Sequence, residues 1–164
     1  MTQDILLTRA KALKLHGVIA HWTEPGNELW LPTLIEWEET ERQQRGLERR
    51  LRQARLPRFK PISDFNWQWP SKCDREAIEE LMHLNFLTDA INPILLGPNG
   101  VGKTTIACNI AYQAALKGQS VLFTTASHLL SDLSAQDGNM AFRRRLKYYE
   151  QLSLLVIDEP KNGV

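Results

Sequence analysis

The chain has 164 residues, of which 43% are hydrophobic, and this is typical of a single globular domain with an ordinary core. It contains no apolar run of the roughly 18 residues that a membrane span needs and no signal peptide pattern, so we expect a cytoplasmic protein without membrane contact. Its two cysteines lack partners at metal-ligand spacing, which argues against a zinc site or a disulfide framework.

The N-terminal part of the chain shows helical periodicity. Apolar residues at helical spacing predict a first helix that extends to about Trp22. They predict a second helix from about Pro32 to Arg55, where Leu-Pro stops it, with a bend or break near Gly46. We therefore expect a small all-helical domain over residues 1–56.

The second of these helices carries a concentrated positive charge. Between Arg42 and Lys60 there are eight basic residues and one acidic residue. Four arginines share one helical face, which suits a DNA phosphate backbone without base reading: Arg42, Arg45, Arg49 and Arg52. The alternative is a solvated face on which arginines pair with upstream acids, which are Glu36, Glu38, Glu39 and Glu41.

An aromatic connector is expected over residues 57–73. Phe65, Trp67 and Trp69 alternate with polar residues, which favours a half-buried, strand-like segment packed on the following domain. Stacking of these rings on nucleobases is the alternative interpretation.

Residues 74–164 alternate between helical and strand patterns. Alternation at this spacing predicts a parallel sheet with flanking helices, and therefore an α/β domain. The expected strands are Ile91–Leu96, Ser120–Thr124 and Leu154–Ile157, and the expected helices are 74–85, Thr104–Leu116, Ser127–Leu133 and Met140–Gln151. Asp74 or Ser71 is expected to cap the first of these helices. The residues of the second helix expected to pack on the sheet are Ile106, Ile110, Ala111, Ala114 and Ala115. The last helix carries Arg143, Arg144, Arg145 and Lys147, which fit either a second DNA contact or a solvated face.

A glycine-rich segment between the first strand and the next helix has the G-x-x-x-x-G-K-T pattern of a phosphate-binding loop. Such a loop points backbone N–H groups inward, and the following helix N-terminus adds positive charge, so phosphate oxygens are the expected ligands. Lys103 would reach the β- and γ-phosphates, and the Thr104 hydroxyl would ligate Mg²⁺. The predicted contacts are Gly97, Pro98, Asn99, Gly100, Val101, Gly102, Lys103, Thr104 and Thr105.

A second motif follows about fifty residues later, where the strand Leu154–Ile157 ends in Asp158 and Glu159. Parallel strands deliver such residues to the edge of the sheet where ligands collect. Asp158 would hold the Mg²⁺ shell, and Glu159 would orient and deprotonate the attacking water. Glu159 and Lys103 are therefore the expected catalytic residues. A solvated strand end is the alternative reading of the acidic pair.

These motifs together with the N-terminal helices resemble the IstB-like ATPases, the insertion-sequence helper proteins related to DnaC-like helicase loaders in the AAA+ class. The resemblance rests on Leu15-His16-Gly17, the arginine-rich helix, Asp64-Phe65, the phosphate loop and Leu155 to Glu159. It implies an ATP-dependent DNA-binding helper that uses its helical N-terminal domain for DNA and partner contacts. This helper would engage the transposase of its own element and would self-associate through the ATPase domain if that domain is completed. A helicase loader in DNA replication is the alternative, and a nonfunctional remnant of either is a third hypothesis.

The sequence departs from this family after the acidic motif. It ends five residues beyond Glu159, without the sensor and arginine-finger regions that the family places there. In the AAA+ class the next strand lies between the strands of Ile94–Leu96 and Leu154–Ile157. We therefore expect an incomplete P-loop (AAA+/RecA-like) sheet, and a fragment or frameshifted copy with impaired hydrolysis, because unpaired buried backbone groups cost about 1–3 kcal/mol each.

Overall fold

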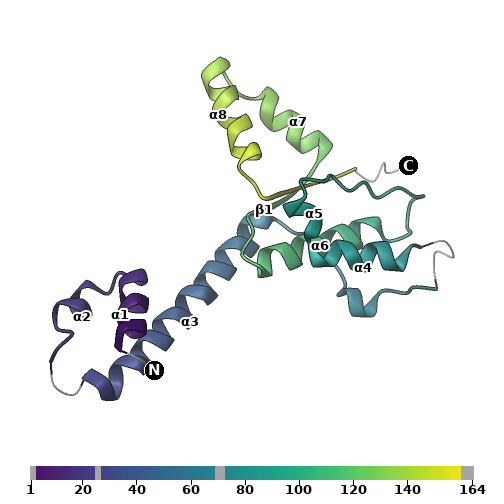
Figure 1. The fold of residues 1–164 in the computed structure, drawn as a ribbon. Coiled ribbons are helices and arrows are strands. Elements are labelled where there is room, and N and C mark those ends of the chain that lie inside the picture. Colours follow the sequence, from purple (N-terminus) through teal and green to yellow (C-terminus); the bar gives the residue numbers. More distant parts are fainter. Residues whose placement is uncertain (1–2, 25–26, 69–72, 160–164) are drawn as a thin grey trace. The chain divides into compact units, whose positions relative to one another are not determined.

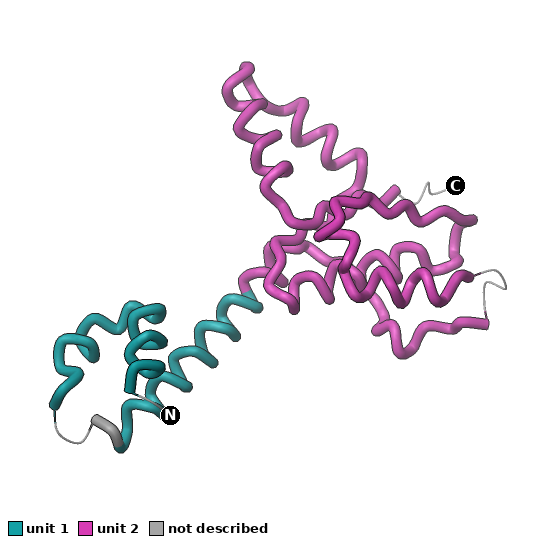
Figure 2. The backbone as a smooth tube through the Cα atoms, in the orientation of Figure 1, with its two compact units in different colours: residues 1–48 teal, residues 49–164 magenta. Residues whose placement is uncertain are grey.

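The computed structural model describes residues 3–24, 27–68 and 73–159. The chain forms two compact units, residues 1–48 and residues 49–164 (Figure 2). The division falls inside a helix, before the end of the helical domain expected at residue 56. The last turn and a half of that helix therefore packs with the second unit.

The described residues of the first unit form helices joined by turns. It holds α1 (Gln3–Ala12), α2 (His16–Ala20) and most of α3 (Asn27–Ala54). The single helix expected up to Trp22 is wrong, because Lys14 has a φ of 55° and interrupts it. The interruption lets apolar residues on both sides of Lys14 pack into one small core, which consists of Leu6, Ala10, Leu13, Leu31 and Ile35 with Leu15 beside it.

An ion pair between Arg9 of α1 and Glu39 of α3 connects these two helices of the first unit. The guanidinium donates from Nε to Oε1 at 2.9 Å and from a terminal nitrogen to Oε2 at 2.6 Å. This hydrogen bonding raises the pKa of Arg9 and lowers the pKa of Glu39. Glu39 is thereby engaged by α1 instead of by the neighbouring arginines of α3.

Helix α3 is longer and more regular than its sequence suggests. It begins at Asn27, so Pro32 lies inside it, and it continues through Gly46 without the expected break. A helical glycine costs only about 1 kcal/mol relative to alanine, and ion pairs four residues apart support the turns before it. The sequence Glu24-Pro25-Gly26-Asn27 predicts a turn before this helix, and residues 25 and 26 of it lie outside the described part of the chain.

The second unit is built around helix α6 and a small sheet (Figure 1). Its elements after α3 are η1 (Ile62–Asp64), α4 (Arg75–His83), α5 (Asn85–Thr88), α6 (Lys103–Leu116), β1 (Val121–Thr125), α7 (Ala126–Ser134), α8 (Asn139–Glu150) and β2 (Leu154–Asp158). Strands β1 and β2 are parallel, from Val121 opposite Leu154 to Thr125 opposite Asp158. The α/β class and the parallel pairing predicted from the sequence are confirmed.

The core of this unit forms around α6. The predicted inward residues of the helix are all buried, and they are Ile106, Ile110, Ala111, Ala114 and Ala115. Helix α4 packs beside α6 through Ile78 and starts as predicted, because Asp74 Oδ1 accepts a hydrogen bond from the Ala77 N–H at 3.0 Å. The glycine-rich loop directly precedes α6 in the chain, so the N-terminus of this packed helix faces the loop.

The strand expected over Ile91–Leu96 is absent, and this prediction was wrong. Residues 91–96 have no regular structure, and the side chains of Ile94 and Leu96 are 78% and 88% exposed. An isolated extended segment has no ladder hydrogen bonds, and no other described segment pairs with this one. The sheet of the described residues therefore has two strands.

The connector packs against the core, although not as a strand. Residues 57–68 contain the short η1 helix and irregular chain. The rings of Phe65 and Trp67 meet edge to face with centroids 4.8 Å apart, and both pack on the core around α6. Packing is thus confirmed for these two rings, while Trp69 lies outside the described residues.

None of the helices within residues 3–24, 27–68 and 73–159 combines the length and the apolar character that a bilayer crossing requires.

Candidate functional site

The glycine-rich loop leads directly into the N-terminus of α6. Gly100 and Gly102 have φ values of 84° and 98°, a region that side chains with a Cβ rarely adopt. Helix α6 begins at Lys103 and no side chain caps its first turn. The first backbone N–H groups of a helix have no intrahelical acceptor, so this end presents donors and positive charge to an anion.

Lys103 closes the loop on itself. Its Nζ donates to the carbonyl oxygens of Gly97 at 2.6 Å and Pro98 at 2.8 Å. The predicted contact residues before it, Gly97 to Gly100, are exposed, and Val101 to Thr105 are half-buried. The ammonium group therefore lies at the loop, where it would meet a bound phosphate.

Two predicted metal ligands from distant parts of the chain lie side by side. The Thr104 hydroxyl, in the first turn of α6, donates to Asp158 Oδ2 at the end of β2 at 3.0 Å. A hydroxyl and a carboxylate are oxygen donors of the type that Mg²⁺ prefers, with phosphates and water completing the shell. Among the described residues no group of three or more His, Cys, Asp or Glu could hold a metal alone. The pair fits Mg²⁺ held jointly with a nucleotide.

Glu159 follows Asp158 directly and is exposed, whereas Asp158 is half-buried. Thr105, the last predicted contact, is half-buried, and its carbonyl accepts a hydrogen bond from Asn109 at 2.8 Å. The motifs predicted separately from the sequence thus come together at one end of α6.

Asn109 is a residue that sequence reasoning missed. It lies one to two turns into α6, is 5% exposed, and is the buried polar residue of the described core. Its side chain bonds to the connector as well as to α6. The available signal was an amide between Cys108 and Ile110 on an apolar helix face, since a buried amide needs hydrogen-bond partners.

Cys108 is fully buried close to the acidic end of β2. Burial, and secondarily the negative charge of Asp158, raise the pKa of its thiol to about 11. At pH 8 about one thiol in a thousand would be ionised at such a pKa, and the thiolate is the reactive form.

We expect iodoacetamide at pH 8 to modify half-buried Cys73 at least about a hundredfold faster than Cys108 in the folded protein, as followed by peptide mass spectrometry. Equal rates in folded protein would contradict the buried position of Cys108.

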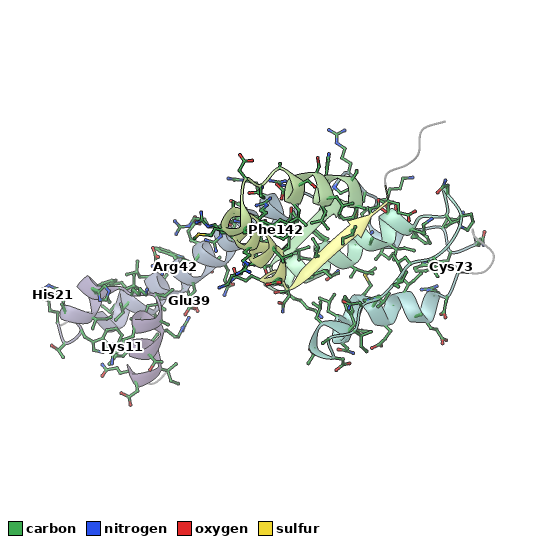
Figure 3. All side chains as sticks on the ribbon, turned by 90° about the horizontal axis from the view of Figure 1, so that it is seen from above. Lys11, His21, Glu39, Arg42, Cys73 and Phe142 are labelled. Carbon is green, nitrogen blue, oxygen red and sulfur yellow. The ribbon has the colours of Figure 1, made fainter. Side chains whose placement is uncertain are left out.

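The four arginines predicted to face DNA are all exposed on α3. Arg42 pairs with Glu38 at 3.2 Å and Arg45 pairs with Glu41 at 3.4 Å (Figure 3, where Arg42 and Glu39 are labelled). Exposed pairs of this kind contribute little stability and are easily exchanged for another anion. Both interpretations of the arginine face therefore have support, the acidic partners for Arg42 and Arg45 and the open exposure for Arg49 and Arg52.

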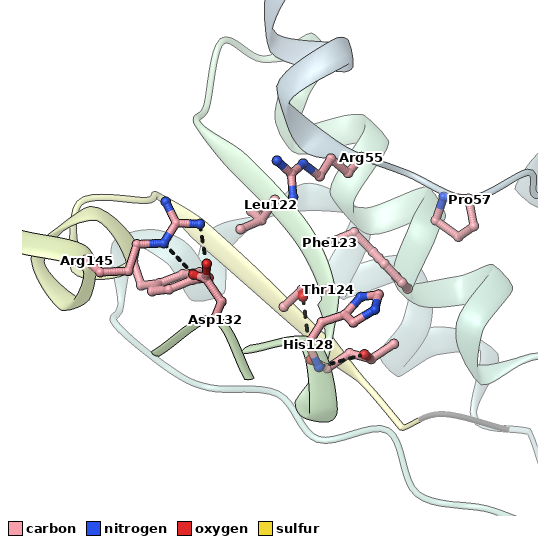
Figure 4. Close-up of a pocket in the computed structure, with 10 residues that line it drawn as sticks. Arg55, Pro57, Leu122, Phe123, Thr124, His128, Asp132 and Arg145 are labelled. Carbon is pink, nitrogen blue, oxygen red and sulfur yellow. Dashed lines mark hydrogen bonds and ion pairs between the residues drawn. The ribbon is translucent and has the colours of Figure 1, made fainter. Parts of the chain in front are cut away.

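A cavity of about 610 Å³ lies elsewhere in the second unit, next to β1 and the α7–α8 pair (Figure 4). Its described lining residues include Arg55, His128 and Asp132 but none of the predicted nucleotide contacts. Asp132 accepts hydrogen bonds from Arg145 and from the Tyr149 hydroxyl, the latter at 2.5 Å, and these bonds lower the pKa of its carboxyl. Arg145 is therefore tied to α7, whereas Arg143 and Arg144 of the same basic cluster are exposed.

The family profile described as IstB-like ATP binding protein matches residues 6–161. The chain belongs to this family. The match covers the helical unit, the connector, the glycine-rich loop and Asp158, so the resemblance predicted from the motifs is confirmed. A mixed α/β fold with a small parallel sheet is consistent with a partial P-loop ATPase fold.

Individual IstB-like relatives agree with the family match. The chain is 37% identical over 118 residues to a protein named as an ATP-binding protein of insertion sequence IS21 from Pseudomonas aeruginosa, which is 72% of this chain and 44% of that protein. It is 32% identical over 126 residues to the ATP-binding protein of IS5376 from Geobacillus stearothermophilus, and the match covers 77% of this chain and 50% of that protein. It is 30% identical over 163 residues to the ATP-binding protein of IS232 from Bacillus thuringiensis subsp. berliner, and the match covers 94% of this chain and 65% of that protein. The chain spans about half the length of the curated relatives it matches.

Proposed function

We propose that this IstB-like chain binds ATP and serves as a helper protein in the transposition of an insertion sequence. The observation that carries the proposal is the 3.0 Å hydrogen bond between Thr104 and Asp158 beside the glycine-rich loop. It joins the two motifs that phosphate binding needs, although they lie more than fifty residues apart in the sequence. The relatives are named for insertion sequences, which favours transposition over helicase loading.

The loop from Gly97 to Thr105 would hold the phosphates. Its backbone N–H groups and the first turn of α6 donate to the phosphate oxygens, and the helix N-terminus adds about half a positive charge. Lys103 Nζ exchanges the carbonyls of Gly97 and Pro98 for the β- and γ-phosphate oxygens. This exchange is favourable because the ammonium group then pairs with negatively charged oxygens instead of neutral carbonyls, which adds ionic attraction to the hydrogen bonds.

Thr104 and Asp158 would hold Mg²⁺, which when bound neutralises negative charge on the phosphates. Glu159 is exposed beside Asp158, where its carboxylate can orient a water molecule and accept a proton from it. The impaired hydrolysis expected from the sequence stays a prediction.

Replacing Asp158 with asparagine is expected to reduce the Mg²⁺ dependence of nucleotide binding. The amide keeps an oxygen near Thr104 but lacks the charge, so the gain in ATP affinity on adding Mg²⁺ should fall by about tenfold. Calorimetric titrations of ATP with Mg²⁺ and with EDTA measure this gain. Asp89, an exposed carboxylate after α5, gives a matched control as Asp89→Asn. An unchanged Mg²⁺ dependence in Asp158→Asn would contradict the assignment.

DNA and protein partners belong to the same proposal. Arg42, Arg45, Arg49 and Arg52 would contact the DNA backbone with little regard to base sequence, supported by their exposure and common helical face. The transposase of the same element would be the protein partner, and the ATP-binding unit would mediate self-association. Co-purification of the chain with that transposase, compared with a replicative helicase, tests the choice between transposition and helicase loading.

A further inference from the structure

The chain from Arg50, near the end of α3, to Phe65 in the connector runs along α6 in the opposite direction. Contacts with α6 occur in order from its C-terminus to the glycine-rich loop. Arg50 Nε donates to the Ala115 carbonyl at 3.0 Å, the rings of Phe59 and Tyr112 lie 5.8 Å apart, the backbone at Lys60 and Ile62 bonds to Asn109, and the ring of Phe65 contacts Gly102. The connector is therefore attached to α6 near the phosphate-binding end.

Asn109 makes the polar part of this attachment. Its Oδ1 accepts from the Ile62 N–H at 2.9 Å, and its Nδ2 donates to the Lys60 carbonyl at 2.9 Å and the Thr105 carbonyl at 2.8 Å. Pro61, between the two connector residues, has no N–H to satisfy, so one carbonyl and one N–H of the connector match the two ends of one amide. The same side chain joins the connector to the first turn of α6.

Phe65 makes the apolar part, at the glycine that precedes Lys103. A Cβ placed on Gly102 would lie 2.5 Å from one ring carbon of Phe65 and 2.9 Å from another, so the ring rests directly against the glycine backbone. The φ of 98° at Gly102 orients the N–H groups that follow. A rigid ring behind this residue restricts how far the loop can relax.

The support becomes important when phosphate binds. In the structure Lys103 holds the loop through the carbonyls of Gly97 and Pro98. These two hydrogen bonds are released when the ammonium group turns to a phosphate, so the loop loses its internal tie at the moment when its N–H groups must converge. Contact with Phe65 does not use any group that the phosphate needs.

We propose that Asn109 is a positioning residue for nucleotide binding, which fixes the connector so that Phe65 supports Gly102 and keeps the phosphate loop in its binding conformation. The inference rests on the proposed ATP binding. It assigns to the connector a function in nucleotide affinity beyond its contribution to the core.

Asn109→Leu tests this assignment, because leucine has a similar volume and no hydrogen-bonding groups. At a temperature where the variant is fully folded by circular dichroism, its ATP affinity should fall by about tenfold, the equivalent of one to two net hydrogen bonds. The matched control is Ile110→Ala, which alters the next buried residue of α6 without touching the connector bonds. Its stability should fall as much or more, and its ATP affinity should stay within about twofold of the original chain.

Two further measurements keep the test decisive if Asn109→Leu does not fold. Phe65→Leu should weaken ATP binding by about fivefold while keeping an apolar side chain in the core. In the original chain, Mg-ADP should slow hydrogen exchange of the Ile62 amide, because a fixed loop holds the connector in return.

The outcomes separate the two proposals. ATP binding by the original chain together with unchanged affinity in Asn109→Leu, or in Phe65→Leu if the first variant does not fold, would overturn the positioning function alone. Unchanged exchange of the Ile62 amide on nucleotide binding would also overturn it. Absence of ATP binding in the original chain would overturn both proposals.

Discussion

Replacing Lys103 with alanine is expected to weaken the binding of Mg-ATP by about a hundredfold or more, which corresponds to about 2.7 kcal/mol. The ammonium group lies at the loop in the structure, within 2.8 Å of two loop carbonyls. Its removal deletes a charge and two or more charge-assisted hydrogen bonds to the phosphates, each of about 1.5–3 kcal/mol. Equilibrium titration with a fluorescent ATP analogue measures the change.

Lys117 offers a control at the opposite end of the same helix. Its Nζ donates to the His83 carbonyl at 3.2 Å, and the residue is exposed. Lys117→Ala therefore removes an equal charge from α6 far from the glycine-rich loop, and ATP affinity should stay within about twofold. If Lys103→Ala bound Mg-ATP as tightly as Lys117→Ala, the assignment of the loop to phosphate would be wrong.

Changing the four α3 arginines together to glutamine is expected to remove most of the DNA affinity. Each arginine that neutralises a phosphate contributes about 0.9 to the slope of log affinity against log salt, so the slope should fall by about three to four units. Fluorescence anisotropy with a labelled duplex, at several salt concentrations, measures both affinity and slope. The loss should be similar for duplexes of unrelated sequence, because backbone contacts carry no base information.

Two double variants distinguish the members of this face. Arg42 and Arg45 have acidic partners one turn upstream, whereas Arg49 and Arg52 are exposed near the end of α3. Breaking an ion pair offsets part of a phosphate contact, so glutamine at 49 and 52 should cost more DNA affinity than glutamine at 42 and 45.

The basic residues of α8 provide the control for this experiment. Glutamine at Arg143 and Arg144 removes two exposed charges outside α3. A large loss in this variant combined with no loss in the α3 variants would move the DNA contact from α3 to α8. A solvated α3 face predicts no change in the salt slope for any α3 variant.

Local patterns in the sequence predicted much of the second unit. The buried face of α6, the Asp74 cap of α4 and the parallel pair of β1 with β2 depend on spacing, capping and strand–helix alternation within short windows. The glycine-rich loop likewise depends on φ values that few other residues adopt, so its pattern is visible in eight consecutive residues.

The strand expected over Ile91–Leu96 failed for a different reason. Its apolar composition is typical of a strand, but a strand exists only where neighbouring backbone satisfies its N–H and carbonyl groups. No described segment pairs with it to do so, and Ile91, Ile94 and Leu96 are exposed. The expected start of a helix near Pro32 and its expected break near Gly46 were also wrong. Helix α3 contains both residues, because a continuous helix tolerates them at a moderate cost in free energy.

By itself, the sequence determined the family to which the chain belongs and the local patterns that carry its predicted chemistry: the glycine-rich loop, the acidic strand end, the helical N-terminal part and the arginine face. Only the tertiary structure decided which side chains meet, as with Thr104 and Asp158, Asn109 and the connector, and Arg9 and Glu39. The reason is physical, because glycine φ preferences and helix periodicity act between near neighbours in the chain. A hydrogen bond between residues 30 to 54 positions apart depends on how the whole unit packs, and no local pattern specifies that.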